Sequence, residues 1–242
     1  PAIKPVVAGA WHYHGDCLLN PDQLMQSLRV RWCNLGVTIV EDTPVQGLMK
    51  ENGAIQAVVT SRGTWPAQQF VFAAGAWSLL LGRSFGWSIP IQPGKGYSIT
   101  MSCPSNAPET PIIFEDTHVA VTPFKDAFRI GSTMEFVGVD SSGHQRRIRL
   151  LIDSAERYLH TTWQEAIEPQ WYGWRPMTWD SNPIIGRIPA HKNAWICAGH
   201  GMLGISTAPA SAQLLRELLL GQSPHVCPKH FSMDRFASRR NR

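Results

Sequence analysis

The sequence near the C-terminus reads Trp195-Ile196-Cys197-Ala198-Gly199-His200-Gly201-Met202-Leu203-Gly204: an apolar strand and a glycine-rich turn, after which the last helix is expected to begin near Thr207 or Pro209. Glycine lets a backbone take a positive φ and lets a flat ligand come close to it. The free N–H groups at the start of a helix favour an anionic or electron-rich group. On these residues alone, a ligand-binding turn and a plain strand-to-helix loop are equally good interpretations.

An arginine precedes this turn. Arg175 lies between Trp174 and Pro176, and the polar stretch Asp180-Ser181-Asn182-Pro183 follows it. A guanidinium fork matches a planar carboxylate. Taken singly, Arg175 is typical of a structural arginine that donates to backbone carbonyls. The flanking aromatic and proline, together with the glycine turn, favour a site for a carboxylate-bearing substrate beside a cofactor.

Five further segments, in the same order along the chain, resemble the FAD-dependent amino-acid oxidoreductases. They are Leu19–Pro21, Gly36–Ile39, Phe70–Ser78, Ile89–Ser98 and Arg129–Glu135. This family includes D-amino-acid oxidase, glycine oxidase and sarcosine oxidase, and the bacterial D-amino-acid dehydrogenases are the branch that the segments resemble most. The resemblance extends over nearly the whole chain.

Local patterns predict the first elements. Asn20 is a good N-cap, Pro21 suits the first helical position, and apolar residues recur at helical spacing until Gly36. Strands are expected over 37–40, 54–60 and 69–73, the last two as a hairpin-like pair around Arg62-Gly63.

The middle of the chain has a different pattern. Short strands over 97–101, 112–115, 118–123 and 128–132 predict an antiparallel sheet, and an amphipathic helix is expected over 146–159. With the resemblance, this predicts a mixed α/β fold: an incomplete FAD-binding Rossmann-like domain and an antiparallel-sheet substrate domain. The expected boundaries are 1–88 for a partial FAD-binding domain, 89–170 for the substrate domain, 171–225 for the return to the FAD-binding domain, and 226–242 for a tail.

The dinucleotide fingerprint of the family is missing from the sequence. The Gly-x-Gly-x-x-Gly turn that holds the FAD pyrophosphate does not occur, and Gly94-Lys95-Gly96 has only the first spacing. The chain also starts at Pro1 without methionine and shows no signal peptide there. We therefore expect a family member without its N-terminal nucleotide-binding segment: a truncated product, a partial sequence or one part of a split enzyme.

The resemblance implies roles for individual residues. Arg175 is the catalytic assignment, because it would pair with the substrate carboxylate, and Tyr97, Tyr172 and His200 are further candidate substrate contacts. The candidate FAD contacts are Val45, Ala74, Gly75, Trp77, Lys95, Gly199, Gly201, Met202, Leu203 and Gly204. For Trp77, packing in the core is an equal alternative. The alternatives for Lys95 and Tyr97 are a surface residue and an ordinary strand aromatic.

The implied reaction is the oxidative deamination of a small amino acid of D configuration by hydride transfer to flavin. The implied partners are that amino acid and an electron acceptor, either a quinone or oxygen. The alternative is a non-catalytic fragment or a subunit that needs a separate nucleotide-binding chain, because strands around Val37 and Phe70 would otherwise leave exposed edges.

Bulk properties narrow the class of protein. Five scattered cysteines without a Cys-x-x-Cys pair favour reduced thiols in the cytoplasm. The net charge of +4, with arginines gathered at the end, favours a frayed solvated tail over a nucleic-acid surface. Peripheral attachment at the inner membrane remains an alternative location. His12, His14 and Asp16 are too few for an expected metal site.

Overall fold

The computed structural model describes residues 2–143, 145–160 and 166–239, and the chain divides into two compact units. Unit 1 consists of Pro1–Val40, Lys95–Glu135 and Asp140–Gly173, and unit 2 of Glu41–Gly94, Phe136–Val139 and Trp174–Arg242. Both units are therefore discontinuous in sequence. The mixed α/β class expected from the sequence is confirmed.

Unit 1 contains a five-stranded sheet in the order β6-β7-β8-β5-β9. The strands are β5 (Gln92–Met101), β6 (Ile112–Phe114), β7 (Val119–Pro123), β8 (Phe128–Glu135) and β9 (Ala166–Met177). The pairs β6–β7, β7–β8 and β5–β8 are antiparallel, as expected from the short alternating strands. Strand β9 was not predicted, because two prolines and Gly173 interrupt its sequence pattern.

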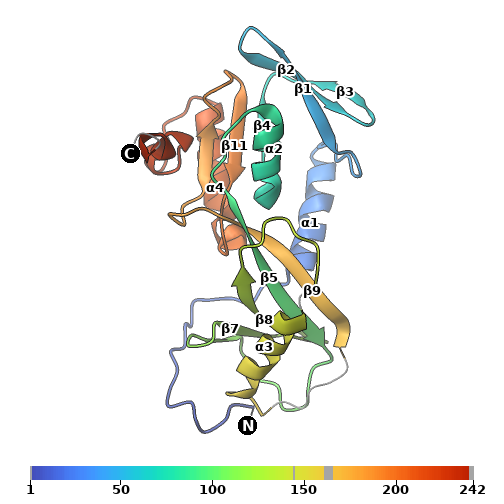
Figure 1. Ribbon diagram of the computed structural model, residues 1–242, viewed down its shortest axis with the longest axis vertical. Coiled ribbons are helices and arrows are strands. Elements are labelled where there is room, and N and C mark those ends of the chain that lie inside the picture. Colours follow the sequence, from blue (N-terminus) through green and yellow to red (C-terminus); the bar gives the residue numbers. More distant parts are fainter. Residues whose placement is uncertain (1, 144, 161–165, 240–242) are drawn as a thin grey trace. The chain divides into compact units, whose positions relative to one another are not determined.

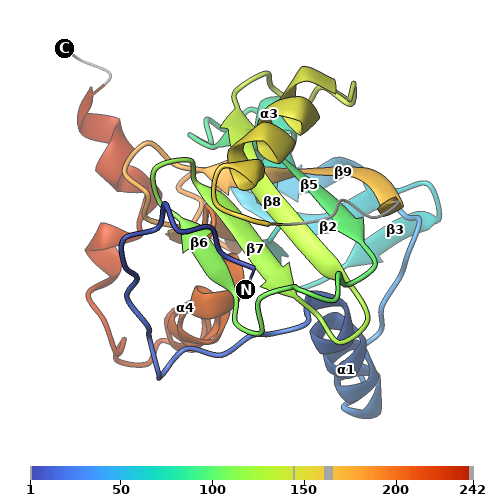
Figure 2. The same ribbon diagram turned by 90° about the horizontal axis from the view of Figure 1, so that it is seen from below.

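Helix α3 (Gln145–Glu156) covers one face of this sheet, as Figure 2 shows. Its apolar face buries Ile148, Leu151 and Ala155, three of the residues that the helical spacing predicted. They share a core with apolar residues of the strands, including Ile99 and Ile130. This face of the sheet is therefore closed by α3.

Helix α1 (Pro21–Asn34) begins where the sequence predicted. The Asn20 side chain accepts from the backbone N–H groups of Asp22 at 3.0 Å and Gln23 at 3.1 Å, and Gly36 takes φ +84° after the last turn. None of the helix residues is buried, so its apolar stripe has no covering element in the described part of the chain.

The strand expected over 37–40 does not form, and this expectation was wrong. A strand needs a neighbour for its N–H and C=O groups. Among the described residues, no strand pairs with this segment, so it is irregular and exposed.

Unit 2 contains a sheet in the order β10-β11-β4, formed by β10 (Ile184–Arg187), β11 (Ala194–Ala198) and β4 (Phe70–Phe72). Strand β11 runs antiparallel to β10 and parallel to β4. The 3-10 turn η1 (Gly75–Trp77) and α2 (Ser78–Phe85) follow β4, and α4 (Gly204–Leu219) follows β11 and packs against it (Figure 1).

A second sheet of unit 2 has the order β1-β2-β3, with β1 (Val45–Glu51), β2 (Ala54–Thr60) and β3 (Gly63–Pro66). The sequence predicted β2 with its correct bounds but the wrong partner. Residues after the Arg62-Gly63 turn form β3 and pair with β2, whereas Phe70–Phe72 joins β11. The apolar character of 69–73 indicated burial without indicating the neighbour.

The C-terminal region contains the 3-10 turns η2 (Pro228–His230) and η3 (Met233–Arg239). Arg235 donates from Nε to Asp180 at 2.7 Å and from Nη2 to the Asn182 carbonyl at 2.7 Å. Desolvation raises the pKa of the Asp180 carboxyl, but the hydrogen bonds that it accepts from Arg235 and from the Asn182 N–H, together with the charge of Arg235, lower it overall. The expectation of a frayed tail was therefore wrong for Arg235.

Glu217 attaches the segment after α4 to the helix. Its carboxylate accepts from the backbone N–H of His225 at 2.9 Å, from the His225 ring at 2.8 Å and from Gln213 at 2.8 Å. These hydrogen bonds lower the pKa of Glu217 from 4.5 to about 2. A carboxyl with a lowered folded pKa stabilises the fold above its unfolded pKa and loses this contribution as the pH falls through the folded value.

We predict that Glu217→Gln lowers the urea midpoint of unfolding at pH 7. The difference in midpoint between this variant and wild type should narrow as the pH falls from 4.5 towards 2. Urea unfolding at several pH values measures this. Glu109→Gln, at an exposed glutamate, is the control. A Glu217→Gln difference that is equal at pH 3 and pH 7 would contradict the assignment.

Candidate functional site

Arg175 lies near the end of β9, in unit 2, and is half-buried. Burial lowers the pKa of its guanidinium, and no nearby anion opposes this effect. Among the described residues, none forms a hydrogen bond or ion pair with Arg175. A desolvated cation normally has an anionic partner. Among the described residues, nothing therefore compensates for the desolvation of Arg175.

The segment around Arg175 is joined to the glycine-rich turn. The Gly201 N–H donates to the Pro176 carbonyl at 3.0 Å. On the other side, the rings of Trp174 and Trp77 meet edge to face, with centroids 5.6 Å apart and planes at 71°. Trp77 is 49% exposed, so it is not a core residue. The structure thus brings three predicted positions, Arg175, Trp77 and Gly201, into one region of unit 2.

The glycine turn has the backbone that its composition predicted. Gly199 takes φ +84° and Gly201 takes φ +55°, both in the region that favours glycine. At Gly199 a Cβ atom would also lie 2.8 Å from Thr178 Cγ2, which is too close. The side chains of Met202 and Leu203 are 70% and 62% exposed. The turn therefore presents backbone and apolar groups rather than charged side chains.

The N-terminus of α4 follows this turn without a side-chain cap, since its N-cap residue is Leu203. Uncapped N–H groups at a helix start favour an electron-rich group nearby. The His200 side chain does not cap these N–H groups, because its Nε2 lies 3.0 Å from Ser211 Oγ on α4. Burial lowers the pKa of His200, which favours the neutral imidazole.

The remaining predicted cofactor positions of unit 2 lie on different elements. Gly75 takes φ +54° where β4 leads into η1, directly after Ala74, and a Cβ atom there would meet open space. Val45 is the first residue of β1 and pairs with Thr60. Val45 therefore belongs to the β1-β2-β3 sheet, whereas the glycine turn follows β11 of the other sheet of unit 2.

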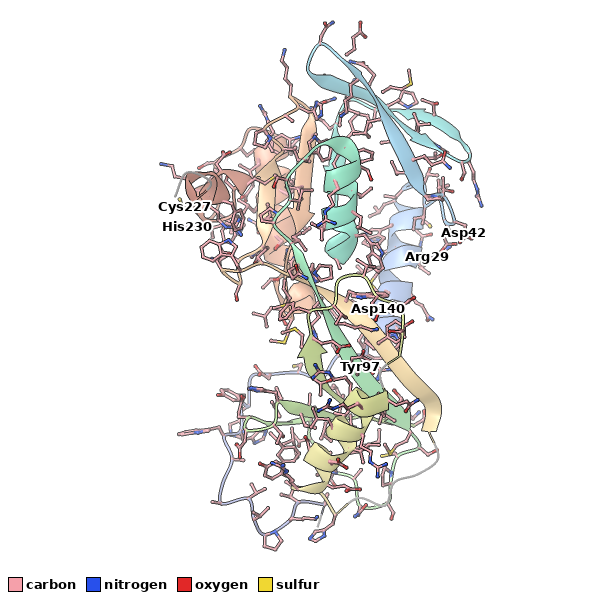
Figure 3. The ribbon with its side chains drawn as sticks, viewed as in Figure 1. Arg29, Asp42, Tyr97, Asp140, Cys227 and His230 are labelled. Atoms are coloured by element: carbon pink, nitrogen blue, oxygen red, sulfur yellow. The ribbon has the colours of Figure 1, made fainter. Side chains whose placement is uncertain are left out.

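In unit 1, the other predicted residues form a buried polar cluster. Lys95 is fully buried; its ammonium donates to the Ser142 carbonyl and lies 3.9 Å from an Asp140 carboxylate oxygen. It also lies 4.4 Å from the centroid of the Tyr172 ring. Lys95 is therefore not a surface residue. That was one of the interpretations that the sequence left open. Figure 3 labels Asp140 on the segment before α3.

Tyr97, also labelled in Figure 3, is 2% exposed and donates its hydroxyl proton to Glu135. Burial and the Glu135 carboxylate both raise the pKa of Tyr97, so the phenol stays protonated. The second Glu135 oxygen accepts from Arg147 Nε at 3.1 Å. Tyr172 donates to the Ser141 carbonyl at 2.6 Å.

Sequence reasoning missed Glu135 and Arg147. Glu135 closes a segment that already resembled the family, but this strand also contains Arg129, Ser132 and Thr133, so one more polar residue gives no signal of a buried contact. Arg147 has no such signal, because it lies on a helix that contains several arginines.

The described residues contain no group of three or more His, Cys, Asp and Glu side chains that could hold a metal ion. The rings of His12 and His14 are 4.3 Å apart in an exposed segment. No helix within the described ranges is both long and apolar enough to cross a bilayer.

Comparison with known proteins decides the family. The family model DAO, described as FAD dependent oxidoreductase, matches residues 1–218. The chain belongs to this family. DAO members depend on FAD, and the positive-φ glycines and uncapped α4 of this chain are compatible with such a ligand.

Relatives in the DAO family cover nearly all of the chain. A D-amino acid dehydrogenase of Chromohalobacter salexigens is 35% identical over 93% of this chain and 53% of its own length. A glycine oxidase of Pseudomonas putida is 29% identical over 97% of this chain and 64% of its own length. The chain thus spans about half the length of the first of these relatives.

Solved structures of the DAO fold agree with the architecture. The L-proline dehydrogenase from P. horikoshii has a TM-score of 0.76 and 25% identity, over 90% of this chain and 60% of its own. The glycine oxidase from Bacillus cereus has a TM-score of 0.71 and 26% identity, over 84% of this chain and 57% of its own.

We predict that Gly199→Ala destabilises the protein by about 1–3 kcal/mol, because alanine is strained at this φ and its Cβ meets Thr178. Urea unfolding measures this loss. Gly221→Ala is the matched control: Gly221 takes φ +64° but has nothing within 4 Å of a Cβ position, so it carries the backbone strain alone. Equal losses in the two variants would rule out the steric contribution at Gly199.

Proposed function

We propose that this chain is the substrate-binding part of an FAD-dependent oxidoreductase that oxidatively deaminates an α-amino acid. The observation that carries the proposal is Arg175, a half-buried guanidinium without an anionic partner among the described residues. An α-carboxylate has the charge and the planar geometry that match it.

Arg175 binds and orients the substrate in this proposal. Burial removes water from the guanidinium, so an ion pair formed there is stronger than one on the surface. Trp174, in edge-to-face contact with Trp77, restricts the space beside it. Because the carboxylate is fixed, the α-carbon of the substrate faces one direction. Holding a reacting group in one orientation lowers the barrier to its reaction.

The residues proposed to hold FAD in unit 2 are Gly75 and the turn from Gly199 to Gly204. The backbone of this turn is free of charged side chains, and the N–H groups of α4 face its end. FAD, when bound, supplies the redox chemistry by accepting the electrons that leave the amino acid. The chain supplies binding, orientation and electrostatics.

The substrate class follows from the relatives. Several are named D-amino acid dehydrogenase, at 31–35% identity, so we propose a small D-amino acid as substrate. A quinone and oxygen remain the two candidate electron acceptors, and we propose the cytoplasm, with peripheral attachment at the inner membrane, as the location.

A specific observation also supports a nucleotide-binding segment supplied by a separate chain. Strand β4 is at the edge of its sheet in the described structure, and Val71 is 45% exposed there. Helix α1 buries none of its residues. Such surfaces are typical of elements that another polypeptide covers.

We predict that the 242-residue chain retains more FAD when it is mixed with a polypeptide that carries the Gly-x-Gly-x-x-Gly segment of a relative than when it is alone. Flavin absorbance after gel filtration measures the bound FAD. The same polypeptide with its glycines replaced by alanine is the control. Equal FAD in all three samples would exclude a separate nucleotide-binding chain.

We predict that Arg175→Met weakens binding of the amino acid by about 2–5 kcal/mol, because the carboxylate loses its partner. Calorimetric titration of the FAD-loaded protein with 2-aminoisobutyrate measures this, since an amino acid without hydrogen on Cα is bound but not oxidised. Arg175→Lys keeps the charge without the fork, so we expect an intermediate loss.

A second readout needs no FAD. Without ligand, Arg175→Met should melt at or above the wild-type temperature, because methionine replaces a desolvated cation that has no partner. Arg62→Met, at an exposed turn, is the control in both measurements. Unchanged affinity in Arg175→Met, or a clear drop in its ligand-free melting temperature, would contradict the proposed role.

A further inference from the structure

His200 has the one polar side chain in the turn from Gly199 to Leu203, which leads from β11 into α4. Its Nε2 lies 3.0 Å from Oγ of Ser211, a buried residue of α4 eleven positions further along the chain. Because α4 begins at Gly204, Ser211 lies about two turns into the helix. The imidazole therefore connects the turn with the interior of the helix that follows it.

The backbone of this turn needs such support. Glycines with positive φ, Gly199 and Gly201, stand on both sides of His200, and glycine is the residue with the most conformational freedom. Two backbone hydrogen bonds restrain the turn: the Gly201 N–H donates to the Pro176 carbonyl at 3.0 Å, and the Leu203 N–H donates to the His200 carbonyl at 3.1 Å. Neither of them reaches into α4, so the side chain of His200 supplies a restraint that these two bonds do not.

The turn lies next to N–H groups that have no acceptor. The first hydrogen bond of α4 runs from the Thr207 N–H to the Leu203 carbonyl at 3.0 Å, and Thr207 Oγ1 donates to the same carbonyl at 2.8 Å. Gly204, Ile205 and Ser206 precede this bond, and their N–H groups find no acceptor among the described residues. A ligand that meets both the turn and these N–H groups needs them in a fixed relation to each other.

The chemistry of the pair suits this task. Burial lowers the pKa of His200 and favours the neutral ring, which has one donor and one acceptor nitrogen and can pair with a hydroxyl in either tautomer. A protonated ring would add a positive charge near the positive end of the helix dipole. Serine is a poorer helix former than alanine, so the bond to His200 explains Ser211 inside α4 better than helix stability does.

We propose that His200 is a positioning residue: through Ser211 it holds the glycine turn in a fixed relation to the free N–H groups of α4, and this arrangement favours reduced over oxidised FAD. The inference rests on the proposed function, which assigns the turn from Gly199 to Gly204 to FAD. Reduction makes the flavin more electron-rich, so correctly oriented N–H groups stabilise its reduced form more than its oxidised form. Loss of the hydrogen bond between His200 and Ser211 should therefore weaken binding of the reduced form most.

The first test needs no FAD and asks whether the two side chains act together. Urea unfolding is measured for His200→Ala, Ser211→Ala and the double variant. Because the single variants remove the same hydrogen bond, the second substitution should change the unfolding constant about three- to tenfold less once the first is present. A control cycle combines His200→Ala with Ser223→Ala, at an exposed serine after α4, and should be additive.

The second test measures the midpoint potential of the flavin in the FAD-loaded protein. We expect His200→Ala and Ser211→Ala to bind reduced relative to oxidised FAD about three- to tenfold more weakly, a fall of about 14–30 mV for a two-electron couple. His200→Gln keeps a hydrogen-bonding group for Ser211 and should retain the wild-type potential, as should the control His230→Ala at an exposed histidine. A loss of fold stability alone would lower the urea midpoint and leave the potential unchanged.

The outcomes separate this inference from the proposed function. An additive cycle for His200 and Ser211, a wild-type potential in His200→Ala, or an equal fall in His200→Gln overturns the inference. If Arg175→Met loses the amino acid while every His200 variant keeps the wild-type potential, the proposed function stands without this role. If Arg175→Met binds the amino acid like wild type while His200→Ala lowers the potential, the role of Arg175 fails and this inference stands. If the wild-type protein binds no FAD, alone or with the nucleotide-binding polypeptide of a relative, both fail together.

Discussion

The desolvation of one guanidinium is the constraint on which the candidate site depends. Arg175 is half-buried near the end of β9, and the described chain offers it no anion. A folded protein keeps such a group only where another interaction compensates for it. The hydrogen bond from Gly201 to the Pro176 carbonyl attaches the glycine turn to the same strand end. The charge and the turn are therefore positioned by one segment.

Local chemistry made part of this fold predictable. Asn20 and Pro21 determine where α1 begins, and the side chain of Asn20 makes the expected capping hydrogen bonds. The mostly apolar run before the Arg62-Gly63 turn located β2, and helical spacing located the buried face of α3. The positive φ of Gly199 follows from the turn composition. In each case the residues concerned are neighbours in sequence, so their pattern contains the information.

Pairing and electrostatic environment were not predictable in this way. Residues 69–73 are apolar in the sequence, but only the structure shows that their neighbour is β11 rather than β2. Glu135 meets Tyr97 of β5 and Arg147 of α3, which come from other elements, and no sequence pattern predicts the positive φ of Thr133 nearby. That Arg175 has no partner among the described residues depends on side chains distant in sequence, so no local pattern indicates it.

The parallel pairing of β4 with β11 determines the order in which unit 2 can assemble on the ribosome. Phe70–Phe72 pairs with Ala194–Ile196, which is synthesised about 120 residues later. At ordinary translation rates this is a delay of roughly 6–25 s. During that interval β4 exists without its only strand neighbour in the described structure, and the residues of unit 1 from Lys95 to Gly173 emerge first. Unit 1 can therefore fold cotranslationally, whereas the β10-β11-β4 sheet forms only after Ala198, the last residue of β11, has left the exit tunnel.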